Sequence, residues 1–152
     1  MKKLLLCVLS IFILFSTTTL CYAGDIPESL LSNDSAQVFF GEIKSVSGDS
    51  ITVFQRQNIK GEFLEGRQQT YAAFSFAGSP IIGKTYLCGF YDEINPLHLW
   101  EVDSLETKDL KIKSKDDMSK RMQKYLNDGK FEEKEKERLS EIAANQDHSS
   151  VT

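Results

Sequence analysis

Short runs in which apolar and polar residues alternate fill the middle of the chain, and this pattern is typical of β-strands. The first predicted strand covers residues 37–46 and has Gly41 at its centre, where a glycine often marks a bulge or a sharp bend. A turn rich in serine, glycine and aspartate follows at residues 47–50, and residues 51–55 alternate as the returning strand. These two strands form a predicted β-hairpin.

Further runs continue this pattern toward the C terminus. They cover residues 70–76, 85–91 and 97–102, and residues 110–112 add a predicted short edge strand. Turn-forming glycine, asparagine and proline residues separate the runs. Because no helical pattern lies between them, the sequence predicts a mainly β fold, a small barrel or sandwich, rather than alternating strands and helices.

The hydrophobic period changes to that of a helix after residue 114. Apolar side chains then recur at positions i, i+4, i+7 and i+8 and form one stripe: Met118, Met122, Tyr125 and Leu126. Aspartates at residues 116–117 suit the positive end of a helix, and the Asp-Gly pair at residues 128–129 is a stop signal. This segment is therefore a predicted amphipathic helix.

A second helical segment, residues 131–144, is mostly charged. Its apolar side chains that could dock on a core are Phe131, Leu139 and Ile142. The last residues, 145–152, are expected to form a disordered tail. Together, residues 114–144 are predicted to be a charged helical extension of the β domain.

The N terminus has the order of a secretory signal. Lys2 and Lys3 precede an apolar run at residues 4–15, and small side chains stand three and one positions before a cut after Ala23. The run is shorter than the roughly 20 apolar residues that span a bilayer. We therefore expect residues 1–23 to be removed and the mature chain to begin at Gly24, outside the cytoplasm, with no insertion into a membrane.

Two other interpretations of the N terminus stay open. An uncleaved signal, with the apolar run continuing as far as Leu20, would hold the protein at the membrane. A lipid anchor would modify Cys21, although the bulky Leu20 stands where a small residue is usual.

The mature chain is long enough for one domain with a real core. Residues 24–36 form a polar lead-in segment, and residues 37–113 form the predicted β domain. Cys88 is the single cysteine after the signal, which leaves no internal disulfide and no cysteine-based zinc cluster. An exported domain of this kind depends on its apolar core and fits a bacterial export route.

Charge argues against one class of partner. The 22 acidic residues all follow Ala23, and 16 of the 18 basic residues do, so the mature net charge is −6. Such a chain is not built to hold nucleic acid by charge, and we expect no nucleic-acid partner. No pattern in the sequence specifies an oligomeric state.

The β region resembles a family of small barrels. The stretches that carry this resemblance are Val38-Phe39-Phe40-Gly41-Glu42-Ile43, Gly48-Asp49, Lys60-Gly61 and Gly83-Lys84-Thr85-Tyr86-Leu87. Over about residues 37–102, this arrangement is similar to the OB-type barrel of the tissue-inhibitor-of-metalloproteinases and netrin-like group. The resemblance implies a five- or six-stranded OB-like barrel. The N-terminal cysteine and the disulfides of those inhibitors are missing, so the inhibitory residues are not carried over.

Two reactive sets lie between residues 88 and 101. Cys88 and His98, with one carboxylate, could form a nucleophile and base, although a cysteine on a strand is more often a small core residue. A metal site could use Asp92, Glu93, His98 and Glu101, but a solvated acidic loop is the commoner structure. His148 lies in the expected tail and is set aside. Neither set is convincing, and no metal or catalytic residue is assigned.

Aromatic residues are unusually dense in three successive strands. They are Tyr71, Phe74, Phe76, Tyr86, Phe90, Tyr91 and Trp100. Most must fill the core, but an aromatic face left exposed would mark a binding surface. The candidates for such a patch are Tyr71, Tyr91 and Trp100.

These observations predict an exported, non-enzymatic binding module that acts on a protein or envelope component. No phosphate loop, nucleophile elbow or paired-carboxylate pattern is visible, so no cofactor is expected. The first alternative is an inhibitor of an extracellular protease, which would insert a loop such as residues 92–97 into a cleft. The second is a cysteine-dependent hydrolase centred on Cys88 and His98.

Overall fold

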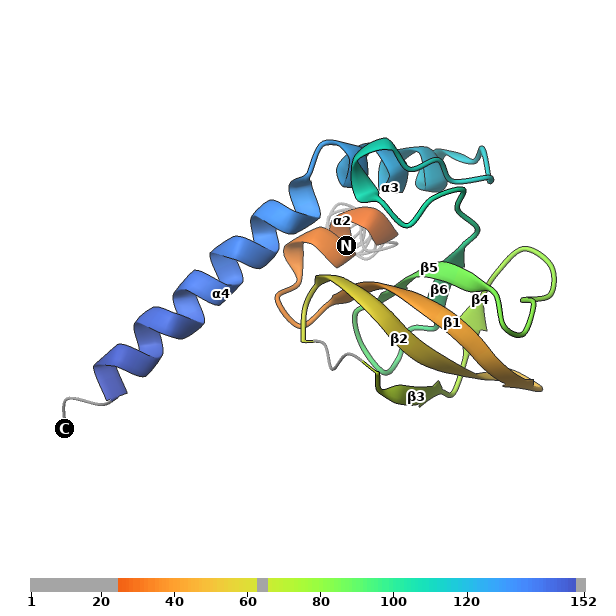
Figure 1. The fold of residues 1–152 in the computed structure, drawn as a ribbon, viewed down its shortest axis with the longest axis horizontal. Coiled ribbons are helices and arrows are strands. Elements are labelled where there is room, and N and C mark those ends of the chain that lie inside the picture. The colour runs from red at the N-terminus through yellow and green to blue at the C-terminus, as the bar shows by residue number, and fades with distance from the viewer. Residues whose placement is uncertain (1–24, 63–65, 150–152) are drawn as a thin grey trace, which may run out of the picture.

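The computed structural model describes residues 25–62 and 66–149 (Figure 1). The predicted signal, residues 1–23, and the prediction of its cleavage lie outside the described residues. Within the described part, a strongly curled β-sheet forms the body of the molecule and helices pack on one of its faces. The prediction of a mainly β chain with a helical extension is confirmed.

The sheet has six strands in the order β3-β2-β1-β5-β6-β4. They are β1 (Gln37–Ser47), β2 (Ser50–Lys60), β3 (Gln68–Tyr71), β4 (Phe74–Ser75), β5 (Thr85–Phe90) and β6 (Leu97–Trp100). The neighbouring pairs are antiparallel except β4 and β6, which run parallel. The sheet is therefore mixed, and its curl gives it the shape of a half-barrel.

The two edges of this sheet are joined by a very short piece of chain. β3 forms one edge and β4 the other, yet only Ala72 and Ala73 separate them in the sequence. The prediction of one continuous strand over residues 70–76 is wrong, because its first part pairs with β2 and its second part with β6. The chain must bend between these pairings, which draws the two edges of the sheet together.

The β1–β2 hairpin is confirmed, and β2 is longer than the sequence suggested. Gly41 lies at a register shift between the two strands, as expected for a glycine inside a strand. A Cβ atom added to Gly41 would overlap the Val53 side chain, so the close approach of these strands requires a glycine there. The curl of the sheet thus has a local cause in the sequence.

Helices precede and follow the strands. They are α2 (Ile26–Ser32), the 3-10 helix η1 (Thr107–Asp109), α3 (Asp117–Asn127) and α4 (Lys130–Ser149). The Asp116 carboxylate accepts a hydrogen bond from the Ser119 N–H at 2.8 Å and caps α3. Gly129, at φ 71°, ends α3 as its stop signal predicted. The expected short edge strand is reduced to one bridge between Val102 and Ile112.

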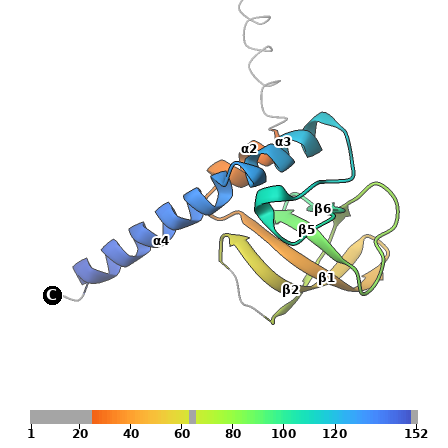
Figure 2. The ribbon, with the colours of Figure 1, turned by 45° about the horizontal axis from the view of Figure 1, so that its top comes forward.

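Helix α4 continues beyond its predicted end. It includes residues 145–149, which the sequence assigned to a disordered tail. These residues follow Ala143 and Ala144 without a glycine or proline to break the helix. In both views α4 extends away from the sheet, so that only its first turns lie against the rest of the domain (Figures 1 and 2).

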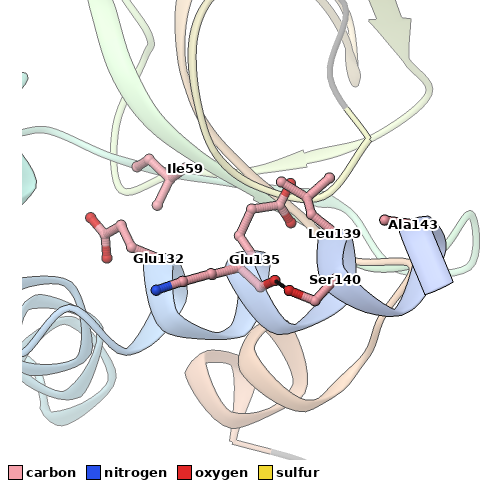
Figure 3. Close-up of a pocket in the computed structure, with 7 residues that line it drawn as sticks. Ile59, Glu132, Glu135, Leu139, Ser140 and Ala143 are labelled. Atoms are coloured by element: carbon pink, nitrogen blue, oxygen red, sulfur yellow. Dashed lines mark hydrogen bonds between the residues drawn. The ribbon is translucent and has the colours of Figure 1, made fainter.

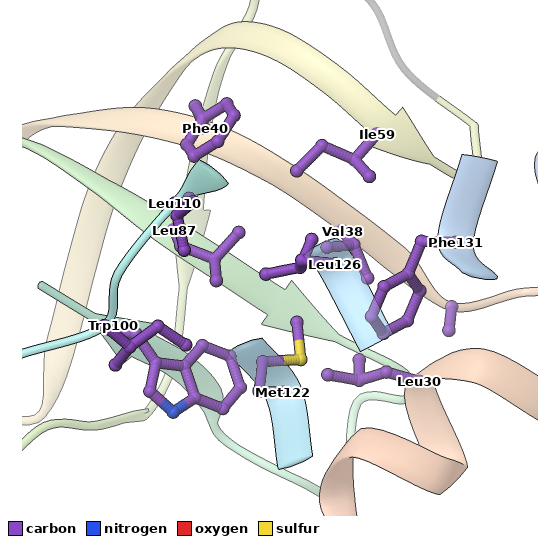
Figure 4. Packing of buried hydrophobic residues seen from close by; sticks show 12 residues of the cluster. Leu30, Val38, Phe40, Ile59, Leu87, Trp100, Leu110, Met122, Leu126 and Phe131 are labelled. Atoms are coloured by element: carbon purple, nitrogen blue, oxygen red, sulfur yellow. The ribbon is translucent and has the colours of Figure 1, made fainter. Parts of the chain in front are cut away.

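Both faces of the sheet are buried. Between the sheet and the helices lies a cluster that includes Leu30, Val38, Phe40, Leu87, Trp100, Met122, Leu126 and Phe131 (Figure 4). The concave face carries Phe39, Ile43, Ile51, Val53, Tyr71, Tyr86, Cys88, Leu97 and Leu99. The predicted stripe of α3 is confirmed, since Met122 and Leu126 are buried in the first cluster and Met118 and Tyr125 pack against it.

Candidate functional site

The three aromatic residues proposed as an exposed patch do not share a face. Tyr71 is buried in the concave cluster, while Trp100 is buried under the helices. Tyr91 is half-buried at the border of the helical cluster and stacks on His98 with 6.4 Å between ring centroids. An exposed patch made of all three is therefore wrong, because the sheet buries aromatic side chains on both of its faces.

The structure does not bring Cys88 and His98 together. Cys88 pairs with Leu99, and both side chains enter the concave cluster, whereas His98 pairs with Gly89 and lies beside Trp100 on the opposite face. Cys88 is fully buried, and burial raises the pKa of its thiol far above the usual range. Burial has the opposite effect on the basic side chain of His98 and lowers its pKa. The sheet register thus separates this nucleophile from this base.

The acidic loop after β5 uses its first carboxylate to build a turn. Asp92 Oδ1 accepts hydrogen bonds from the Ile94 and Asn95 N–H groups, both at 2.9 Å, and from Asn95 Nδ2 at 2.8 Å. The Asn95 side-chain hydrogen bond is the main cause of the lowered pKa of Asp92. Within residues 25–62 and 66–149, no group of at least three metal-ligating side chains converges on one point.

Glu101, the last member of the proposed metal set, takes part in ion pairs with lysine side chains. Its carboxylate forms ion pairs with Lys84 and Lys113. Hydrogen bonds from these two ammonium groups hold the pKa of Glu101 below its usual value. Asp92 therefore stabilises a turn, and Glu101 belongs to a surface ion-pair cluster.

The turn at residues 92–96 presents one aliphatic side chain to solvent. Ile94 is 95% exposed, more than any other large hydrophobic residue that the structure describes. Its N–H is held by Asp92, and Leu97 directly after the turn is fully buried in β6. The Leu97 N–H also donates to the Ala73 carbonyl at 3.0 Å. The exposed isoleucine thus stands on a turn that is fixed at both ends.

A cavity of about 320 Å³ lies beside this turn. It is lined by Gln69, Thr70, Tyr71, Ala72, Ala73, Phe90, Glu93, Ile94 and Asn95. Tyr71 and Phe90 meet edge to face in its lining, with 5.0 Å between ring centroids. The cavity therefore joins the edge strand β3 to the exposed turn, and we define these lining residues as the edge site.

Two other hollows are larger than the edge-site cavity. A shallow groove of about 490 Å³ follows one stripe of α4 beside Ile59, where Leu139 and Ala143 lie along the helix (Figure 3). A cavity of about 450 Å³ lies between the β6 end and the start of α3. There Asp116 is occupied by capping α3, and hydrogen bonds from Ser114 and Ser119 lower its pKa to about 2.

Sequence reasoning named the loop but missed Ile94. The signal was present, because an isoleucine stands inside the polar run Asp92-Glu93-Ile94-Asn95-Pro96, where nothing in a strand or helix pattern requires an apolar side chain. An aspartate side chain that accepts hydrogen bonds from the backbone N–H groups two and three residues later is a common turn motif. Together these features predict an apolar side chain on a fixed turn.

Comparison with known proteins finds no matching family model, no similar curated protein and no similar solved structure. Among the residues that the structure describes, no helix has the length and apolar character needed to cross a membrane. The edge site combines a cavity with an exposed aliphatic side chain on a fixed turn.

Proposed function

We propose that this chain is an exported, non-enzymatic binding module, an OB-like barrel that docks on a protein or envelope component through the turn at residues 92–96. The observation that carries the proposal is the 95% exposure of Ile94 on a turn fixed by Asp92. Burying an aliphatic side chain of this size contributes about 1.5–3 kcal/mol. Because the turn is already ordered, little conformational entropy is lost on binding.

The charges around Ile94 define the complementary surface. Asp92 and Glu93 directly precede it, and the segment from Tyr91 to Leu97 contains no basic residue. A partner that buries Ile94 would therefore match this turn best with an apolar pocket bordered by lysine or arginine. Such complementarity speeds association and discriminates against acidic partners.

A protease inhibitor is the second candidate, and the same turn favours it. An inhibitory loop presents an ordered side chain to a cleft with little rearrangement, and the turn presents Ile94 in this way. The cysteine-dependent hydrolase has no such support, because Cys88 and His98 lie on opposite faces of the sheet.

The test is crosslinked capture from native envelope and culture medium, with the chain from Gly24 as bait. We expect Ile94→Asp to lose a stoichiometric partner that wild type retains, because it places a charge in the proposed apolar contact. Ile82→Asp is the matched control, since Ile82 is 64% exposed in the loop at the other end of β5.

Equal loss with both variants, or capture that Ile94→Asp leaves intact, contradicts a role for this turn. Recovery of an active protease that wild type inhibits and Ile94→Asp does not would place the inhibitor first. A thermal unfolding measurement on each variant separates lost binding from lost folding.

A further inference from the structure

The edge strand β3 directs some of its backbone groups away from β2, and among the described residues no strand pairs with them. The Gln55 N–H donates to the Arg67 carbonyl at 2.9 Å. This hydrogen bond determines which opposite residues of β2 and β3 form hydrogen-bonded pairs and which do not. Hydrogen-bonded pairs alternate with non-bonded pairs in an antiparallel ladder. Gln68 and Thr70 therefore direct their N–H and C=O groups away from β2, toward the open side of the sheet.

A side-chain contact between the two strands agrees with this assignment of hydrogen-bonded and non-bonded pairs. The hydroxyl oxygens of Thr70 and Thr52 lie 2.8 Å apart across the two strands. Side chains approach each other most closely at non-bonded positions. Thr70 is thus at a position whose backbone is available for pairing with another strand.

β3 is short and a bulge at Gly66 and Arg67 precedes it, but within β3 itself two common protections of a free edge, lysine and proline, are missing. Proteins commonly protect free edges with lysine, proline, a bulge or a covering loop. β3 has the sequence Gln-Gln-Thr-Tyr, with no charge and no proline. Gln68, Gln69 and Thr70 are exposed along it.

The edge-site cavity supplies a place for one side chain of an added strand. Tyr71, Ala72 and Phe90 give it an apolar lining, and Ile94 extends that lining to the surface. Glu93 is the charged member of this lining and is exposed. A strand laid along β3 directs every second side chain to the face on which Tyr71 lies.

We propose that the module recognises an extended segment of its partner protein, which pairs with the free edge of β3 and inserts an aliphatic side chain into the edge-site cavity. Basic residues next to that side chain would meet Glu93. In this mode the main-chain hydrogen bonds provide affinity and the cavity provides specificity. The inference rests on the proposed binding function and adds the form of the ligand.

The test uses a defined probe, a fluorescent acetylated peptide of alternating threonine and valine with one central isoleucine flanked by lysines. A second peptide carries glutamate in place of lysine, and a third has N-methylated amides that cannot pair. Fluorescence polarisation measures their binding to wild type, Thr70→Pro and Thr70→Ala. Proline removes the outward N–H of Thr70 but leaves the bonds to β2, while alanine removes only the hydroxyl.

We expect the lysine peptide to bind wild type and Thr70→Ala with equal affinity. Its affinity for Thr70→Pro should be about tenfold weaker, which corresponds to about 1.4 kcal/mol. The glutamate and N-methylated peptides should also bind more weakly. Should Thr70→Pro fail to fold, the N-methylated peptide gives the same test on the wild-type chain. Thermal unfolding of each variant shows which comparison applies.

Equal binding of the lysine and N-methylated peptides, or no saturable binding up to about 1 mM, overturns strand addition. The underlying function is tested separately by Ile94→Asp in the capture experiment. A partner that is lost with Ile94→Asp and kept with Thr70→Pro would leave the binding module standing and remove the strand-addition mode.

Discussion

At the scale of single residues, His98 shows how a polar side chain can belong to the core. Its ring lies between Tyr91 and Trp100, with centroid separations of 6.4 and 6.0 Å. Its Nε2 atom is buried and has no hydrogen-bond partner among the described residues. The charged imidazolium is therefore disfavoured, and burial lowers the pKa of His98.

This burial predicts a pH-dependent stability. The folded state binds the His98 proton less readily than the unfolded chain, in which a histidine has a pKa of about 6.5. The free energy of unfolding should therefore fall as the pH decreases through about 6.5 toward the lower folded-state value. Urea denaturation between about pH 8 and pH 5 measures this slope.

His98→Phe should flatten the pH dependence, because phenylalanine fills the same aromatic stack without a titrating group. His148→Gln, which changes the second histidine of the chain, should leave the wild-type slope unchanged. Parallel pH profiles for wild type and His98→Phe would show that other groups cause the effect.

At the scale of elements, a half-buried carboxylate attaches α4 to the sheet. Glu135 accepts the Gly61 N–H at 2.9 Å and two hydrogen bonds from the Arg138 guanidinium, each at 2.8 Å. Burial opposes ionisation, but these partners keep the pKa of Glu135 below its usual value. The mostly charged helix thus docks through polar contacts as well as through Phe131.

Glu135→Ala tests this attachment. Gly61 is buried, so the variant leaves its N–H without an acceptor, which typically costs about 1–3 kcal/mol of unfolding free energy. Amide hydrogen exchange should also accelerate in the first turns of α4. Glu141→Ala changes an exposed carboxylate of the same helix and should alter neither measurement. Equal effects of both variants would contradict the docking role.

At the scale of the whole molecule, α4 divides into a docked part and a projecting part. Phe131 is fully buried in the helical cluster. Leu139 and Ile142 remain 52% and 41% exposed, although the sequence counted them as docking residues. Their exposure shows that the domain offers them little surface to pack against, and Figure 2 shows α4 extending away from the sheet.

This division predicts that the projecting part is dispensable for folding. Removal of residues 139–152 should change the unfolding free energy by less than about 1 kcal/mol, as is usual for exposed positions. Phe131→Ala should cost about 3–5 kcal/mol, since it removes a buried aromatic side chain. Chemical denaturation of the two variants makes the comparison. A truncation as costly as Phe131→Ala would show that the projecting part packs against the domain in solution.

The sequence predicted the local elements well. The β1–β2 hairpin, the bulge at Gly41 and the apolar stripe of α3 follow from short-range patterns that need no partner. The loop of the edge site was also identified, together with the acidic residues before Ile94. These features are encoded by neighbouring residues, and the structure places them as the patterns indicated.

The tertiary structure alone decided which side chains meet. Because the sheet is covered on both faces, alternation could not say whether Tyr71 or Trp100 would be exposed. The pairing of β5 with β6 put Cys88 and His98 on opposite faces, and strand register is a long-range property that local sequence does not specify. The edge site likewise exists only because the bend at Ala72 and Ala73 brings β3 beside the turn that carries Ile94.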